Sequence, residues 1–191
     1  MTKISFYLTL TLYGAATLVY LACLLNTSPC RVVLARRVLM AGFITHLLTI
    51  IHRFIAAKHL PITNMHEALS FFAFAIVGIY LLFDTKYKVN SLGSFVVPFA
   101  LLVTIVAGLL PTAIKPLNPA LQSAWLYSHT LLAFGAYACF TISATVAALF
   151  LIQSHFLKKK NLGKLFLKLP SLDTLDEIGY RCLVFGFPML T

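Results

Sequence analysis

The sequence predicts an all-α fold: a polytopic bundle of transmembrane helices, treated as one transmembrane domain over residues 1–191. Apolar residues make up 60% of the chain and charged residues only 10%, whereas about a quarter of a soluble domain is charged. A soluble fold of this length could not hide so much apolar surface, because small domains keep a large surface-to-volume ratio. The apolar residues also gather in runs, and the positive charges lie in short blocks between them.

Five of these runs approach the length of about 20 residues that a membrane-spanning helix needs. The first, 4–25, is longer than the apolar part of a signal peptide and follows a single lysine, so we expect a retained span. The next four runs are 38–57, 68–83, 95–114 and 130–152. The third is short, and we expect it to borrow a turn from residues 65–67. A truncated sixth run, 180–191, is too short to span.

The charges between the runs predict which side of the membrane each loop occupies. Ten basic residues follow the first, third and fifth runs: Arg31, Arg36, Arg37, Lys86, Lys88, Lys158, Lys159, Lys160, Lys164 and Lys168. The other side has only Lys3, Lys58, Lys115 and, at the end of the second run, Arg53. Cytoplasmic loops carry the excess of basic residues, so the N-terminus and segments 58–67 and 115–129 should lie outside. We expect a lipid bilayer as surroundings and no nucleic-acid partner, because no soluble module remains to bind one.

Ionisable residues inside the second run form the first candidate site. His46 lies near the middle of that run, where exposure to lipid is costly, so it should face the bundle interior and have a partner there. Arg53, seven residues later, falls on the same helical face nearer the outer end. Two interpretations of His46 remain open: a structural, hydrogen-bonded histidine, or a ligand of a metal or cofactor.

The outer segment 58–69 groups turn-forming and ionisable residues: His59, Pro61, Asn64, His66 and Glu67. Pro61 should break the second helix, and Thr63 or Asn64 should cap the third. Glu67 would then lie in the first turn of that helix, where the helix dipole favours a carboxylate. The segment is therefore either a well-built turn or the mouth of a site with imidazole and carboxylate groups.

The second outer segment brings a histidine beside the single tryptophan of the chain. It contains residues that end one helix and start the next: Pro116, Pro119, Gln122 and Ser123. His129 follows Trp125 by four residues, so the two rings share one face of a helix that enters the membrane. A histidine beside an aromatic ring at this depth is a candidate axial ligand for a flat, apolar cofactor such as haem.

Three segments, in order, resemble the cytochrome c assembly proteins of the CcsA/ResC type. Residues 59–72, HLPITNMHEALSFF, resemble the family segment P-x-x-N-x-x-E-S-L-x-F, and residues 121–129, LQSAWLYSH, resemble L-x-S-x-W-L-x-x-H. LDTLDEIGYR at 172–181 and GFPMLT at 186–191 are similar to the stretch L-D-x-L-x-Y-R-x-x-x-x-G-F-P-x-L-T. The resemblance extends from the second run to residue 191.

The resemblance implies a role in handling haem b for cytochrome c maturation, on the periplasmic face of the bacterial inner membrane. His129 matches the family's outward-facing histidine and is the expected axial ligand of the haem iron, with His46 as a second, intramembrane candidate. Arg53, Lys58 or Lys115 could neutralise the haem propionates. The implied partners are a CcsB/ResB-like membrane protein and apocytochrome c.

In that family the G-F-P-x-L-T stretch leads into a further span and a tryptophan-rich outer loop that cradles haem. We therefore expect this chain to correspond to the front part of the family's domain, as a fragment, a truncated form, or one of two polypeptides. It could belong to a cytochrome c haem lyase complex, and we expect no lyase activity from it alone. The alternatives are a scaffold or regulator of haem biosynthesis, as in HemX-like relatives, and a small-molecule transporter. A transporter is expected to contain a repeated pair of broken helices, and the sequence shows no such pair.

Overall fold

The computed structural model describes residues 2–25, 29–113, 123–160, 163 and 168–191. Within these residues the chain forms helices and no strands, as predicted. The helices are α1 (Thr2–Leu25), α2 (Pro29–Ala57), α3 (Met65–Tyr87), α4 (Asn90–Leu109), α5 (Ala124–Lys158) and α6 (Leu172–Leu190). The first five are long and apolar enough to cross a membrane. This confirms the five predicted spans.

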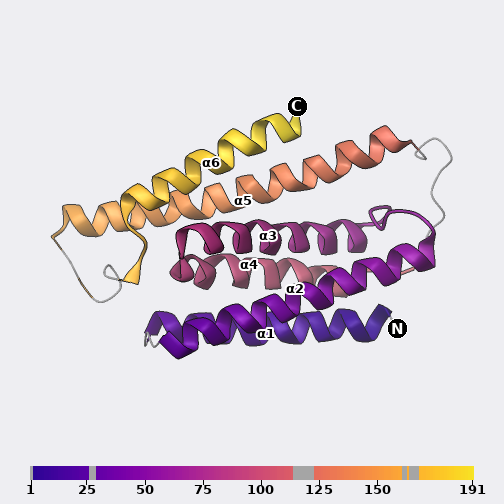
Figure 1. The fold of residues 1–191 in the computed structure, drawn as a ribbon, viewed down its shortest axis with the longest axis horizontal. Helices are drawn as coiled ribbons and strands as arrows, with labels where there is room; N and C mark the ends of the chain where they lie inside the picture. Colours follow the sequence, from indigo (N-terminus) through magenta and orange to yellow (C-terminus); the bar gives the residue numbers. More distant parts are fainter. Residues whose placement is uncertain (1, 26–28, 114–122, 161–162, 164–167) are drawn as a thin grey trace.

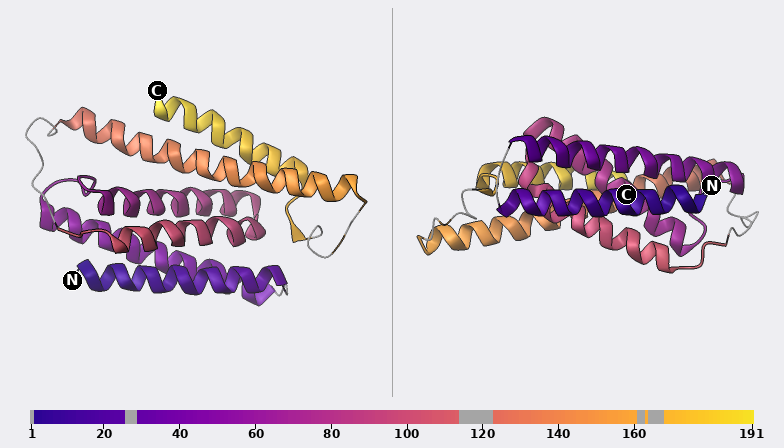
Figure 2. Two further views of the ribbon diagram at one scale, coloured as in Figure 1. Left: turned by 180° about the vertical axis from the view of Figure 1, so that it is seen from behind. Right: turned by 90° about the horizontal axis from the view of Figure 1, so that it is seen from below.

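The spans run back and forth along one axis (Figure 1). As a result the start of α1, the turn between α2 and α3, the end of α4 and the start of α5 lie at the same end of the bundle. We call this the N-terminal end. α1 packs against α2 and α4, α3 packs against α4 and α5, and α6 runs back along α5, as the two views of Figure 2 also show.

The helices of the structure differ from the predicted runs at their ends, and α2 and α4 show the two kinds of difference. α2 begins at Pro29 rather than at residue 38, and therefore contains Arg31, Arg36 and Arg37. Hydropathy marks only the lipid-embedded part of a helix, whereas the backbone hydrogen bonds continue into the polar loop. α4 ends at Leu109 rather than at residue 114, because Leu110 is extended. A proline disfavours helical backbone in the residue before it, and Pro111 follows Leu110.

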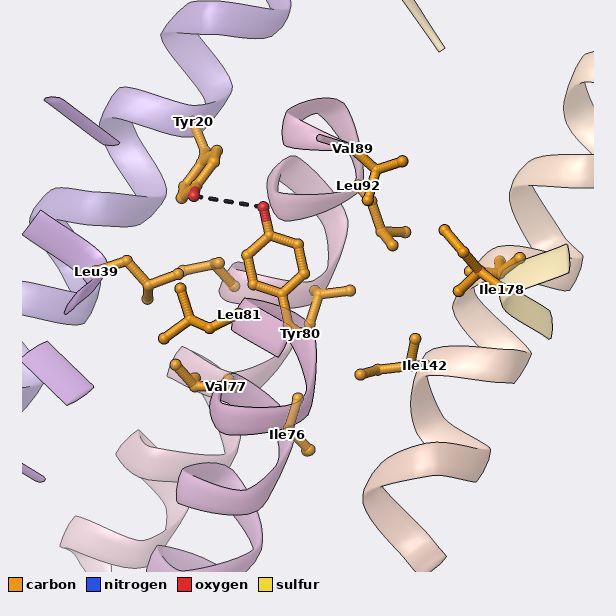
Figure 3. Packing of buried hydrophobic residues seen from close by; sticks show 14 of the residues in the cluster. Tyr20, Leu39, Ile76, Val77, Tyr80, Leu81, Val89, Leu92, Ile142 and Ile178 are labelled. Carbon is orange, nitrogen blue, oxygen red and sulfur yellow. Dashed lines mark hydrogen bonds between the residues drawn. The ribbon is translucent and has the colours of Figure 1, made fainter. Parts of the chain in front are cut away.

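The core joins five of the helices through large side chains that are fully buried. Tyr20 of α1 accepts a hydrogen bond of 3.3 Å from the hydroxyl of Tyr80 on α3, and Figure 3 shows this pair among aliphatic neighbours. Leu92 of α4, Ile142 of α5 and Ile178 of α6 complete the cluster. The tyrosines satisfy each other, so this junction leaves neither hydroxyl unpaired away from water.

α6 begins at Leu172, eight residues before the predicted sixth run, and its first turn is capped. Ser171 is the N-cap, and its hydroxyl accepts a hydrogen bond from the backbone of Thr174 at 3.2 Å. Asp173 lies in the first turn, where the helix dipole favours negative charge. Two turns along the helix, a hydrogen bond from Arg181 holds the pKa of the Glu177 carboxyl below its ordinary value.

Candidate functional site

The turn between α2 and α3 is built as a helix cap. Asn64 is the N-cap of α3, and its side-chain oxygen accepts a hydrogen bond from the backbone of Glu67 at 2.9 Å. The Glu67 carboxylate in turn accepts hydrogen bonds from the Thr63 backbone at 2.9 Å and from the Thr63 hydroxyl at 2.8 Å. The predicted turn is confirmed, with Asn64 rather than Thr63 as the capping residue.

Glu67 is also the partner of Arg53. The Arg53 Nε donates to Glu67 Oε1 at 2.7 Å, and both side chains are buried. A second guanidinium nitrogen of Arg53 donates to the Thr112 carbonyl at 2.8 Å. One arginine thus joins α2, the first turn of α3 and the segment that follows α4. Together with the Thr63 bonds, these contacts satisfy both oxygens of a buried carboxylate, as a buried charge requires.

His66 lies next to this ion pair but faces another helix. Its side chain is 5% exposed, and its Nδ1 lies 2.7 Å from the Ala107 carbonyl of α4. Its ring also contacts the ring of Phe6 on α1, with 5.1 Å between the centroids. The sequence placed His66 in the turn and assigned it no function of its own. The sequence feature that could have indicated a function for His66 is the position of its imidazole directly before Glu67. The hydrogen-bond partners of His66 could not be read from the sequence.

A cavity of about 490 Å³ opens beside these residues at the N-terminal end, between α1, α2, α3 and the end of α4. Its lining includes charged and polar side chains from three helices: Lys3, Thr49, Arg53, His66, Glu67 and Ser70. Apolar walls come from Phe6, Ile50 and Leu109. A cavity with mostly apolar walls and a few converging polar groups is the usual form of a small-molecule site.

His46 does not line the cavity but contacts a residue that does, and it is fully buried. Its Nδ1 lies 3.1 Å from the Tyr13 hydroxyl, and its Nε2 lies 2.9 Å from the hydroxyl of Ser70, which lines the cavity. The prediction that His46 faces the bundle interior and has a partner is confirmed. Both ring nitrogens are engaged, so these contacts favour the structural interpretation of His46 over the ligand interpretation.

His129 and Trp125 lie apart from the cavity. Both are in the first turns of α5 at the N-terminal end, where Trp125 is 78% exposed and His129 is also exposed. His59 lies in the α2–α3 turn, half-buried, with its Nδ1 3.0 Å from the Leu60 carbonyl. The structure therefore brings Arg53 and Glu67 together and leaves His129 on a separate surface. The expectations for Lys115, Pro116, Pro119 and Gln122 concern residues outside the described part of the chain.

A comparison of the sequence with models of known protein families places the chain in one of them. Residues 43–191 match the family model of the cytochrome C assembly protein, so the chain belongs to that family.

The similar proteins include some named CcsA and others named HemX. The cytochrome c biogenesis protein CcsA of Chlamydomonas reinhardtii is 34% identical over 151 residues, which cover 75% of this chain and 42% of that protein. Protein HemX of Brevibacillus brevis is 28% identical over 184 residues, covering 96% of this chain and 68% of that protein. Protein HemX of Bacillus subtilis (strain 168) is 31% identical over 140 residues, covering 68% and 48%. The chain spans about half the length of the CcsA relatives that it matches.

Proposed function

We propose that this protein handles haem in cytochrome c maturation. It binds haem b through His129 on the outer face of the membrane and presents it for covalent attachment to apocytochrome c. Membership of the cytochrome c assembly family supports the pathway. The observation that carries the residue assignment is the exposure of His129 beside Trp125 at the end of α5.

The residues of this surface fit a haem. An axial ligand must present a ring nitrogen to the iron, and an exposed imidazole can do so without breaking the core. Trp125 lies one turn before His129 on the same helical face, and its exposed indole offers a flat apolar surface beside the imidazole. A haem on this surface would keep one face open toward a partner. The CcsB/ResB-like membrane protein and the apocytochrome are the partners we propose.

The chemistry that such a haem supplies is the addition of apocytochrome thiols to its vinyl groups. The task of this chain is to bind and orient the haem and to keep it at the membrane surface. His129 holds the iron, and the positive charges of Lys3 and Arg53 lie at the same end of the bundle. We do not propose that the chain is a lyase by itself, because one exposed histidine fills only one axial position.

The test compares two histidines of α5 in cells whose cytochrome c maturation depends on this chain. We expect His129→Ala to lower covalently bound haem in the c-type cytochromes by about tenfold or more, because loss of ligation costs at least that much. His155→Ala is the matched control, since His155 is exposed near the other end of the same helix. Both variants should reach wild-type levels in the membrane. Equal maturation with both variants would refute the assignment.

The second candidate function is a membrane scaffold or regulator of haem biosynthesis without a haem site, as the resemblance to HemX-like relatives implies. Protein HemX of Brevibacillus brevis is matched along 96% of this chain. A scaffold tolerates His129→Ala but fails when its helices are repacked. The same comparison of variants therefore separates the two functions.

A further inference from the structure

We infer that the cavity at the N-terminal end is a second binding site for an iron porphyrin with carboxylate side chains. In this site His66 Nε2 ligates the iron and Arg53 binds a carboxylate. The identity of the ligand rests on the proposed function, whereas the site itself rests on the contacts of His66 and Arg53.

The contact of the His66 ring with α4 fixes which ring nitrogen carries the proton. A carbonyl oxygen only accepts hydrogen bonds, so His66 Nδ1, 2.7 Å from the Ala107 carbonyl, carries the hydrogen. In the neutral ring the lone pair is then on Nε2. Among the described residues Nε2 has no hydrogen-bond partner, and the ring lines the cavity. Histidines that bind metals commonly donate their other ring N–H to a backbone carbonyl in this way, which fixes the ring and its tautomer.

Two helices also hold the His66 ring in one orientation. His66 is held between the α4 backbone at Ala107 and the Phe6 ring of α1, 5.1 Å away between centroids. A ligand residue held from two helices loses little freedom on binding. His46 is the contrasting case, because Tyr13 and Ser70 engage both of its nitrogens. Of the two buried histidines, only His66 can ligate a metal without giving up a contact that holds its ring.

The charged side chains of the cavity lining favour an anionic ligand. Arg53 uses one N–H on Glu67 and one on the Thr112 carbonyl, out of the five that a guanidinium carries. The carboxylate of Glu67 is already satisfied by Arg53 and Thr63. With His66 neutral, Lys3 and Arg53 leave the lining with one net positive charge. The remaining donors of Arg53 can therefore bind the carboxylate of a ligand, a charge-assisted contact about twice as strong as a neutral one.

The cavity has the size of a small-molecule site and an open rim. The cavity volume of about 490 Å³ lies within the range of about 300–1,000 Å³ for small-molecule sites. Tyr7 and Leu109 line it and are 57% and 81% exposed, so its rim is open. An amphiphilic ligand can enter there from the membrane surface, with its apolar part against Phe6 and Ile50.

The experiment is a titration of the purified full chain with haem, followed by optical absorption. We expect the wild-type protein to bind two haems, one at His129 and one at His66. His66→Gly should bind one, and added imidazole should restore the second by filling the space of the lost ring. His66→Gln keeps a donor for the Ala107 carbonyl but no iron ligand, so it should also bind one haem. His52→Gly is the matched control, because His52 is half-buried on α2 and does not line the cavity; it should bind two.

A second arm tests the carboxylate contact without a mutation. The dimethyl ester of haem lacks free carboxylates, and we expect it to bind the His129→Ala variant about tenfold or more weakly than haem does.

The outcomes separate this inference from the proposed function. Two haems bound by His66→Gly and by His66→Gln without imidazole would overturn the inference. So would a single haem in the wild-type protein that disappears with His129→Ala, and in that case the proposed function would stand. Absence of haem binding by the wild-type chain would overturn both.

Discussion

At the scale of single residues, the Arg53–Glu67 pair decides whether the polar end of the bundle can form. Removing two charges from water costs several kcal/mol per ion, and only good geometry with further hydrogen bonds offsets this cost. The pair meets that condition through Thr63 and the Thr112 carbonyl. Its separation along the chain is 14 residues, so it fixes how α3 sits against α2.

Breaking one side of this pair should be more costly than removing both sides. We expect Glu67→Leu or Arg53→Met alone to lower the free energy of unfolding by about 3–5 kcal/mol, because a buried charge is left unpaired. The double variant should recover most of that loss. The measurement is a double-mutant cycle from unfolding in SDS mixed with a mild detergent. Additive losses in the double variant would show that the two charges do not stabilise each other.

The same contacts explain what could be predicted of the site and what could not. The capping turn at Asn64 and Glu67 was predictable because its hydrogen bonds join residues three or four apart. The partners of His66 and His46 were not, because Ala107 lies 41 residues from His66 and Tyr13 lies 33 residues from His46. The choice of ring nitrogen depends on these distant contacts. The sequence therefore indicated a candidate ligand role for His46 and placed His66 only among the residues of the outer segment.

At the scale of elements, α6 packs on α5 through close contacts at glycines. A Cβ on Gly186 would come within 2.7 Å of the Phe140 ring of α5, a distance that real Cβ atoms do not tolerate. A Cβ on Gly179, two turns earlier on the same helix, would lie 3.7 Å from Val146, an ordinary contact. The interface between α5 and α6 therefore has no room for a side chain at Gly186 but has room for a methyl group at Gly179.

Alanine at these two positions should therefore have opposite consequences. We expect Gly186→Ala to destabilise the protein by about 1–3 kcal/mol, because α6 must shift to relieve the overlap. Gly179→Ala should be neutral or slightly stabilising, because alanine favours the helix. Thermal unfolding of the purified variants in detergent measures both. Equal unfolding temperatures for the two variants would contradict this account of the interface.

Helix existence was predictable because each span must satisfy its own backbone hydrogen bonds inside the membrane. The residues at which the helices begin and end were less predictable. α2 extends through Arg31, Arg36 and Arg37 although that stretch is not hydrophobic, and α4 stops early at Leu109. The packing of α6 on α5 could not be derived from hydropathy either, because it depends on which glycine faces which aromatic ring.

At the scale of the whole molecule, the basic loops predict one orientation for the bundle. The start of α5 and the cavity lie at the N-terminal end, while Lys86, Lys158 and Lys159 lie at the opposite end. Because basic loops stay in the cytoplasm, the N-terminal end should face outward. Both proposed haem sites depend on this orientation.

Cysteine labelling tests the orientation directly. In a variant without native cysteines, Ser123→Cys should react with a membrane-impermeant maleimide on intact cells, because Ser123 is exposed at the start of α5. Lys159→Cys, exposed after the end of the same helix, should react only once the membrane is permeabilised. The reverse pattern would place His129 and the cavity in the cytoplasm.

Haem binding by this chain is tested by the optical absorption spectrum of the wild-type protein, purified from membranes of cells that make haem. We expect a haem absorption band that follows the protein through purification and falls when His129 is replaced by alanine. A purified, folded protein with no haem absorption, before and after incubation with haem, would contradict this expectation.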